Sequence, residues 1–206
     1  MKSLTRYISI LIAIIGCSLS VSANNGATLL DKAADKFQRT KSISASFTMS
    51  GNGSTSNGKI TISGDRFVIE MSELSIWYNG RTQWTYSRAN NEVSITEPTP
   101  DELQQINPFA IVSAFRKAYS ATTISNSNGV TKIKLTPLSS RGEAITSIVL
   151  AMNNATLYPT EIKLSLDNGE TITIVTKNIK EGSSLPASTF SFDKKAFPNA
   201  EIIDLR

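Results

Sequence analysis

Few residues in this sequence have the type and spacing that covalent catalysis needs. The chain contains no histidine, which excludes Ser-His-Asp triads, Cys-His pairs and histidine-ligated metal sites. Its single cysteine, Cys17, lies in the apolar N-terminal stretch, and no two carboxylates can be paired as acid and base. Ser191 and Lys194 match the Ser-x-x-Lys pattern of some acyl-enzymes, but on an expected strand end rather than a helix start. We therefore expect no enzymatic activity, no cofactor and no metal site, and an enzyme that uses Ser191 is the weakest alternative.

Aromatic residues gather around one turn, in the sequence IWYNGRTQWTY. The dipeptide Asn79-Gly80 is typical of tight hairpin turns and is flanked by Trp77, Tyr78, Trp84 and Tyr86. Alternation along a strand places Trp84 and Tyr86 on one face, which we expect to be the inner face. Trp77 and Tyr78 point to opposite faces, so at least one of them should pack under a loop or at the rim. We interpret the cluster as the lining of a cavity, although most apolar strand residues are ordinary core.

The first 23 residues have the features of an export signal. A basic start precedes an apolar run at residues 7–19, too short to be a membrane anchor, and Val21-Ser22-Ala23 matches a signal-peptidase site. We expect cleavage at this site, which leaves residues 24–206 as a single domain. The alternative is a lipoprotein signal, because the residues before Cys17 resemble a lipobox whose cysteine becomes lipidated.

The charge of the chain gives no indication of nucleic-acid binding. Without the two basic residues of the N-terminal segment, the 21 Lys and Arg residues become 19, against 17 Asp and Glu residues. No basic run occurs, and the lysine pairs Lys132/Lys134 and Lys194/Lys195 are best explained as solvated surface. Docking of these lysines to acidic partners is the alternative. No stretch after residue 23 is long and apolar enough to form a membrane-spanning helix.

Hydrophobic periodicity predicts a mainly β fold with two or three helices. Residues 27–40 carry an apolar stripe at helical spacing, and helix starts at Thr99-Pro100 and Asn107-Pro108 interrupt the strand pattern in the middle of the chain. Ten or eleven antiparallel strands joined by short turns are expected, at 43–50, 59–63, 66–71, 74–78, 82–87, 92–96, 130–136, 144–152, 160–166, 170–176 and 189–192. Because so few helices cannot cover both faces of a large sheet, the sheet should curl around its apolar side, with the helices against it.

In their order and spacing, several segments resemble the LolA family of periplasmic carriers of outer-membrane lipoproteins. The matching segments are SISASFT, GKITISGDRFVIEM, IWYNGRTQWTYSRANNEVSI, NPFAIVSAF and LPASTFSFDKKAFPNAEIIDL. The resemblance implies an incomplete β-barrel whose α-helical lid covers an apolar cavity for the acyl chains of lipoproteins. It also implies a monomer in the periplasm of a Gram-negative bacterium, with an inner-membrane lipoprotein-releasing transporter and an outer-membrane acceptor as partners.

Periodicity and the resemblance together select the site residues. The candidate lid residues are Phe109, Val112, Phe115 and Tyr119. The candidate cavity wall consists of Phe47, Ile60, Ile62, Phe67, Ile69, Trp84 and Tyr86. One position departs from the family: proteobacterial members have an Arg-Pro pair, whose Arg bonds to the lid, where this chain has Ser63-Gly64. Arg66 follows three residues later, and we do not assign it that role. A receptor or lipid sensor of the same fold, anchored through Cys17, is the alternative function.

Overall fold

The computed structural model describes residues 25–99, 102–103, 107, 110–139 and 144–206. The expected signal peptide therefore lies outside the described residues. The helices are α1 (Asn25–Arg39), α3 (Ala110–Ala118) and the short 3-10 helix η1 (Ala187–Phe190). The strands are β1 (Ser42–Gly51), β2 (Ser54–Ser63), β3 (Arg66–Met71), β4 (Leu74–Tyr78), β5 (Gln83–Ser87), β6 (Glu92–Thr96), β7 (Tyr119–Ser127), β8 (Val130–Pro137), β9 (Ile145–Asn153), β10 (Pro159–Leu166), β11 (Thr171–Gly182) and β12 (Glu201–Asp204).

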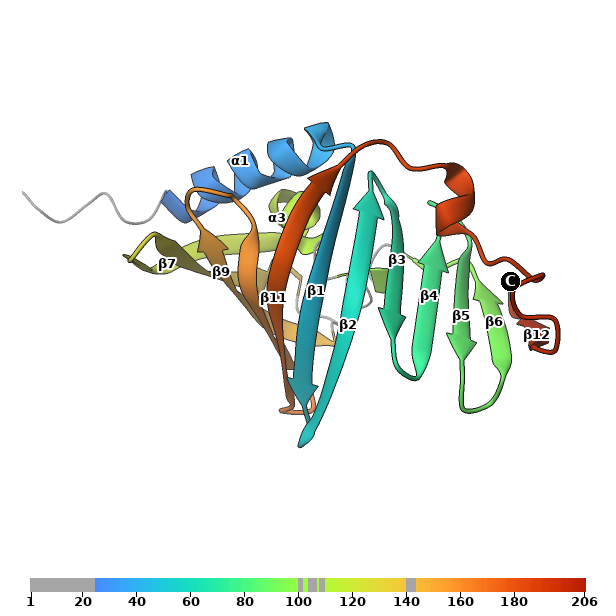
Figure 1. Cartoon of the computed structure of the whole chain (residues 1–206). Helices are drawn as coiled ribbons and strands as arrows, with labels where there is room; N and C mark the ends of the chain where they lie inside the picture. Colours follow the sequence, from blue (N-terminus) through green and yellow to red (C-terminus); the bar gives the residue numbers. More distant parts are fainter. Residues whose placement is uncertain (1–24, 100–101, 104–106, 108–109, 140–143) are drawn as a thin grey trace, which may run out of the picture.

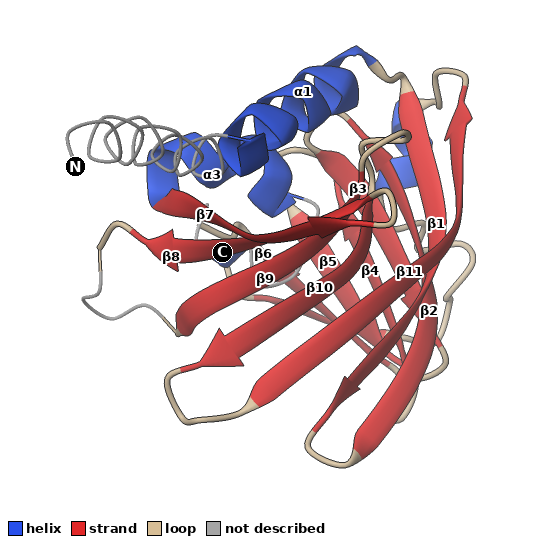
Figure 2. Ribbon diagram, turned by 90° about the vertical axis from the view of Figure 1, so that its left-hand side faces the viewer, coloured by secondary structure: helices blue, strands red, loops and turns tan. Residues whose placement is uncertain are grey.

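The strands of the described chain form one sheet in the order β12-β6-β5-β4-β3-β2-β1-β11-β10-β9-β8-β7 (Figure 1). Two runs of antiparallel neighbours, β1 to β6 and β7 to β11, are joined where β1 pairs with β11. The sheet curls so that β7–β9 and β3–β6 lie on opposite sides of its interior, with α1 and α3 across one end (Figure 2). It does not close, because β12 and β7 are its two edges. The predicted incomplete barrel with a helical lid is confirmed.

The interior is filled by the concave face of the sheet and the apolar stripe of α1. Leu30 and Ala33 of α1 are fully buried, and Phe37 is nearly so. They share one cluster with concave-face residues from β1 to β4 and from β8 to β11. A stripe at helical spacing can make this contact only if the helix lies across the concave side. None of the described helices is long and apolar enough to cross a membrane.

Four sequence-based expectations about the elements are wrong. The described sheet has twelve strands rather than ten or eleven, and β12 pairs with β6 in parallel rather than antiparallel orientation. The helix expected after Asn107-Pro108 ends at Ala118, before the last residue of its apolar stripe, because Tyr119 is the first residue of β7. The expected strand at 189–192 is replaced at its start by η1, whose N-terminal flank is Pro186. Proline has no backbone N–H for a strand ladder but is compatible with a helical start.

The last turn of α1 is held against the β9–β10 connection and β11. Lys36 Nζ lies 2.8 Å from a carboxylate oxygen of Glu181 and donates to the carbonyl oxygen of Thr156 at 3.0 Å. The same ammonium group is 4.5 Å from the ring centre of Tyr158, and the Phe37 ring packs on Tyr158 at 5.3 Å. The hydrogen bond from Lys36 is the largest cause that lowers the pKa of Glu181. These contacts fix the end of the helix that borders the candidate site described below.

Replacing Tyr158 with phenylalanine should change how stability depends on alkaline pH. The Tyr158 hydroxyl is buried near Thr40 and Glu181 without a well-formed hydrogen bond, and burial raises its pKa from 10.0 to about 12. Because the pKa is raised in the folded state, the contribution of the protonated Tyr158 side chain to stability is intact below pH 10 and is lost as the pH rises from 10 to 12. Urea unfolding gives the free energy of unfolding of the wild type and of Tyr158→Phe. The wild-type value minus the variant value should fall by about 1–2 kcal/mol across that pH window. A constant difference between the two proteins would contradict the assignment.

Candidate functional site

Strand pairing sorts the side chains of β1 to β4 onto two faces. Directly opposed residues of an antiparallel pair point to the same side. Ile43 pairs with Ile62, Ile62 with Phe67, and Phe67 with Tyr78. All four are buried in the main core cluster, so this side is the concave face. The outer side of the same strands therefore carries the alternate residues.

A pocket of about 370 Å³ lies at one end of this concave face. Its boundaries are the end of α1, the β2–β3 turn, the β4–β5 loop and the segment before α3. It is lined by Phe37, Gln38, Thr40, Ile43, Ile62, Gly64, Asp65, Phe67, Tyr78, Gly80, Leu103, Asn107 and Ala110. The volume falls in the range of roughly 300–1,000 Å³ that is usual for small-ligand sites. The lining is mixed, with six apolar side chains, five polar ones and two glycines.

The concave-face residues expected from the sequence are brought together by the fold. Ile60, Ile62, Phe67 and Ile69 are buried in the main core cluster, and Phe47 packs against it. The ring of Phe47 covers Gly58, where an added Cβ would lie 2.4 Å from a ring carbon. Only Ile62 and Phe67 of this set line the pocket itself.

Five pocket residues with apolar or aromatic side chains were missing from the sequence-based set: Phe37, Ile43, Tyr78, Leu103 and Ala110. Signals for two of them were present. Phe37 ends the apolar stripe of the first helix, and Ile43 begins the alternation of the first strand. Their placement at the pocket depends on how α1 lies across the sheet, which neither pattern specifies.

The placement of Trp84 and Tyr86 on the cavity wall is wrong. Trp84 pairs with Trp77 and Tyr86 with Ser75, which puts both residues on the outer face. There the ring of Tyr86 lies 4.6 Å from that of Phe197, and Trp77 packs edge-on against Phe197 at 5.9 Å. The alternation was predicted correctly, but the inward pairs of this hairpin are Tyr78 with Gln83 and Ile76 with Thr85. The expectation that Trp77 and Tyr78 point to opposite faces is confirmed.

The outer aromatic cluster is covered by the segment that follows β11. This segment runs outside β3 and β4 and returns to the β6 edge as β12 (Figure 1). Phe190 of η1 is fully buried, and Phe192 lies 5.7 Å from Trp77 and 5.3 Å from Phe197. The molecule therefore has a second, smaller apolar cluster on its outer face, separate from the pocket.

The helical cover is anchored by buried residues of α3. Val112 and Phe115 are 0% and 3% exposed, in the same cluster as the concave face. Tyr119 joins that cluster from the start of β7, and Phe109 lies outside the described residues. Arg116 forms a two-point ion pair with Asp31 that connects α3 to α1.

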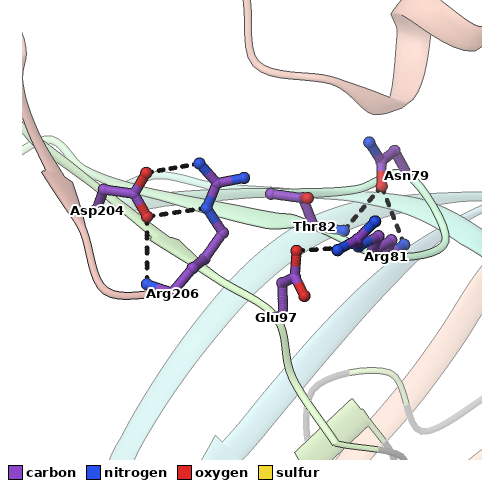
Figure 3. Close-up of polar contacts among 6 residues, drawn as sticks. All are labelled: Asn79, Arg81, Thr82, Glu97, Asp204 and Arg206. Atoms are coloured by element: carbon purple, nitrogen blue, oxygen red, sulfur yellow. Dashed lines mark hydrogen bonds and ion pairs between the residues drawn. The ribbon is translucent and has the colours of Figure 1, made fainter.

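The loop next to the pocket differs from the expected two-residue turn. Only Gly80 adopts a positive φ, of 100°, and the β4–β5 connection is a four-residue loop. The Asn79 side chain stabilises it by accepting backbone N–H groups of Arg81 at 3.0 Å and Thr82 at 2.9 Å (Figure 3). Arg81 in turn forms a 3.0 Å ion pair with Glu97.

The segment that leads to α3 begins with the expected helix cap. The side chain of Glu102 accepts the backbone N–H of Thr99 at 2.7 Å and its hydroxyl at 2.9 Å. The backbone N–H of Glu102 in turn donates to Thr99 Oγ1 at 3.4 Å, which makes the capping arrangement reciprocal. The backbone hydrogen bond is the largest cause that lowers the pKa of Glu102. This acid is therefore used in the cap.

A known protein family matches most of this chain. The family described as outer membrane lipoprotein carrier protein LolA matches residues 17–168. This chain belongs to the LolA family. The match ends within the β10–β11 connection, so the outer aromatic cover lies beyond it. No curated protein sequence matches the chain significantly.

Solved structures of similar fold have low sequence identity to this LolA-family chain. An uncharacterized conserved protein from Thermus thermophilus has a TM-score of 0.58 at 12% identity, covering 86% of this chain and 98% of that one. A DUF1329 family protein from Desulfovibrio piger has a TM-score of 0.52 at 12% identity, with 84% and 98% covered. MucB has a TM-score of 0.51 at 15% identity, with 83% and 64% covered. At such identities the similarity shows the fold alone.

The position at which this chain departs from the LolA pattern has a structural consequence. Gly64 has a φ of 61°, a conformation that the proline of an Arg-Pro pair cannot adopt. Arg66 does not take the place of the missing arginine at the lid. Its guanidinium lies 4.7 Å from the ring centre of Phe190 on the outer face and donates to Ser63 Oγ at 3.3 Å.

The Ser-x-x-Lys match is not assembled as a catalytic pair. Ser191 follows η1 on the outer face, and the described chain shows no hydrogen bond between Ser191 and Lys194. An activated serine needs a base within hydrogen-bond reach. The LolA fold is a binding fold, and the pocket is the feature of this structure that suits binding.

Proposed function

We propose that this protein is a periplasmic carrier that binds the acyl chains of lipoproteins and moves them from the inner to the outer membrane. The observation that carries this proposal is the pocket between the apolar concave face and the helical cover, in a chain of the LolA family. The proposed wall residues are Ile62 and Phe67 in the pocket, with Phe47, Ile60 and Ile69 beside it on the concave face. Phe109, Val112 and Phe115 are the proposed lid residues.

A carrier must release what it binds, so its affinity for acyl chains must be limited. The lid residues that pack on the concave face provide such a limit. Burying one methylene is worth about 0.8 kcal/mol, so eight carbons on each of three chains would give roughly 19 kcal/mol. That approaches the practical ceiling of non-covalent affinity, at which release is too slow for transport. Val112 and Phe115 already cover the concave face. Acyl chains that enter here would therefore replace protein contacts rather than water, which lowers the net affinity.

Binding of a triacylated lipopeptide by the mature protein tests the proposal. Vesicles carrying the lipopeptide would be mixed with residues 24–206 and then floated on a density gradient. We expect lipopeptide to leave the vesicles and remain with the soluble protein at a limiting ratio near one to one. A non-acylated peptide of the same sequence is the control. Lipopeptide that stays entirely with the vesicles, at any protein concentration, would rule out the carrier function.

The N-terminus of the protein isolated from its bacterium decides between a free carrier and an anchored form. Export with cleavage before Asn24 fits a carrier that travels between an inner-membrane transporter and an outer-membrane acceptor. Mass spectrometry should find an unmodified Asn24. A diacylglyceryl group on Cys17 would instead support a membrane-anchored receptor of the same fold.

A further inference from the structure

Charge is divided unevenly between the two halves of the sheet. The six neighbouring strands β2, β1, β11, β10, β9 and β8 contain six lysines and no arginine (Figure 2). The same strands contain two acids, Glu161 and Glu181, and Glu181 is already paired with Lys36 of α1. The strands of the other half, β3 to β6 and β12, contain one cation, Arg66, against four acids. The positive charge of the sheet therefore lies in the half from β2 to β8.

The pairing of the strands directs these lysines to the outer side of the sheet. Ser46 of β1 lies between two residues of the concave face and is opposite both Lys177 and Lys59, so all three point outward. On β8 and β10 the lysines alternate with fully buried core residues, Ile133 and Ile162 among them. All six lysines are exposed, and together they define the lysine face: Lys59, Lys132, Lys134, Lys163, Lys177 and Lys180.

The charge of the lysine face is available to a partner outside the molecule. No ion pair joins any of the six lysines to an acid in the described part of the chain. The strands of this half contain one aromatic residue, Phe47, and it packs against the concave core cluster. The face therefore offers spread positive charge without an aromatic anchor.

Spread lysines suit a lipid surface better than a protein surface. The cores of protein interfaces are depleted in Lys and enriched in aromatic residues and Arg, whose planar fork pairs with carboxylates at two points. The lysine face has neither of these. A layer of anionic head groups needs only positive charge, and each lysine close to such a surface adds to the attraction. Because no large apolar side chain is there to insert, the association is reversible.

We propose that the lysine face docks this protein reversibly on membranes that contain anionic phospholipids. The inference goes beyond the carrier function, because it concerns the outer face of the sheet rather than the pocket. Strands β3 to β6, on the far side of the barrel interior, would then be turned away from the lipid (Figure 2). The acids of that half would escape repulsion by the membrane, so the division of charge also sets the orientation.

Flotation with lipid vesicles tests this proposal. The mature protein would be mixed at about 50 mM salt with vesicles of phosphatidylcholine alone, or with about a third phosphatidylglycerol of the same acyl chains. Only the charge of the surface then differs. We expect the protein to float with the anionic vesicles alone and to leave them at about 300 mM salt, where charges are screened over shorter distances. Lys163→Gln and Lys177→Gln, made together, should weaken this binding by about tenfold or more.

The matched control removes two exposed lysines from the helices. Lys32→Gln with Lys117→Gln, on α1 and α3, lowers the net charge equally and should weaken binding by less than about threefold. All four positions are exposed, so both double variants should fold. An equal loss of binding in the two variants would show that net charge attracts the protein, and would overturn the role of the lysine face.

Two further outcomes would overturn docking on anionic membranes. The first is a wild type that floats equally well with uncharged vesicles, because contact with acyl chains would then explain the binding. The second is a wild type that ignores anionic vesicles. If that protein bound polyglutamate and lost it in the Lys163→Gln/Lys177→Gln variant, the lysine face would instead belong to an acidic protein partner. Each of these results leaves the carrier function to its own test with the lipopeptide.

Discussion

Replacing Ala110 with tryptophan should abolish most acyl-chain binding without unfolding the protein. Ala110 is half-buried and faces the pocket from the first turn of α3, so an indole there would occupy space that is open in the structure. Overpacking normally destabilises a filled core, but this position borders a cavity. Excluding about four methylenes would cost roughly 3 kcal/mol of affinity, a loss of about a hundredfold.

Titration with a fluorescent acyl probe would measure this loss, and thermal unfolding would confirm that the variant is folded. Ala155→Trp, at an exposed position in the β9–β10 connection, adds the same indole away from the pocket and should bind as the wild type does. Unchanged affinity in a folded Ala110→Trp protein would mean that acyl chains bind elsewhere.

Replacing Phe190 with alanine should lower the free energy of unfolding by about 3–5 kcal/mol and leave acyl binding almost unchanged. Phe190 is fully buried beneath the cover of the outer aromatic cluster, and Arg66 stacks on its ring at 4.7 Å. Its removal would leave a cavity and loosen η1 from β3. The pocket lies on the other face of the sheet, and Phe190 is not among the residues that line it.

Urea unfolding followed by circular dichroism would give the stability, and the same probe would give the affinity. Leu205→Ala, at a side chain 64% exposed, should change stability by less than about 0.5 kcal/mol. An affinity for the probe that falls in step with stability would show that the outer cluster and the pocket are one unit. Intrinsic tryptophan fluorescence should follow the outer cluster, because Trp77 and Trp84 lie on that face.

The sequence predicted the local elements well where the pattern was strong. The stripe of α1 and the alternation from Ile43 are found in the fold, and the links from β2 to β6 are short as expected, although the Asn79-Gly80 link is a four-residue loop. Strand β2 begins at Ser54, five residues earlier than expected. Each of these features depends on residues within about ten positions of one another. The curl of the sheet could also be inferred, because the number of helices was too small to cover two faces.

Features set by distant residues could not be read from the sequence. Alternation places Trp84 and Tyr86 on one face of their strand, but it does not say which face is the inner one, because both faces of the hairpin carry aromatic residues. What decides the matter is the cover provided by Phe192 and Phe197, about a hundred positions away. No local pattern reports that pairing.

Strand β7 was missed because its sequence lacks the usual alternation. The stretch SATTISNS is mostly polar, and a register shift between Thr123 and Ser125 interrupts its pairing with β8. Ile124 lies within this shift and is 54% exposed. Such irregularities are common in edge strands, where they discourage pairing with other chains.

Isoleucine methyl NMR with a spin-labelled acyl chain tests most directly whether the pocket is the binding site. The mature protein would carry labelled isoleucine δ1-methyl groups, and the ligand a nitroxide within its acyl chain. Binding in the pocket predicts saturable broadening of the Ile43 and Ile62 signals, while Ile124 and Ile202, exposed near the two sheet edges, stay sharp. Broadening of Ile124 or Ile202 with Ile43 and Ile62 unaffected would contradict the account.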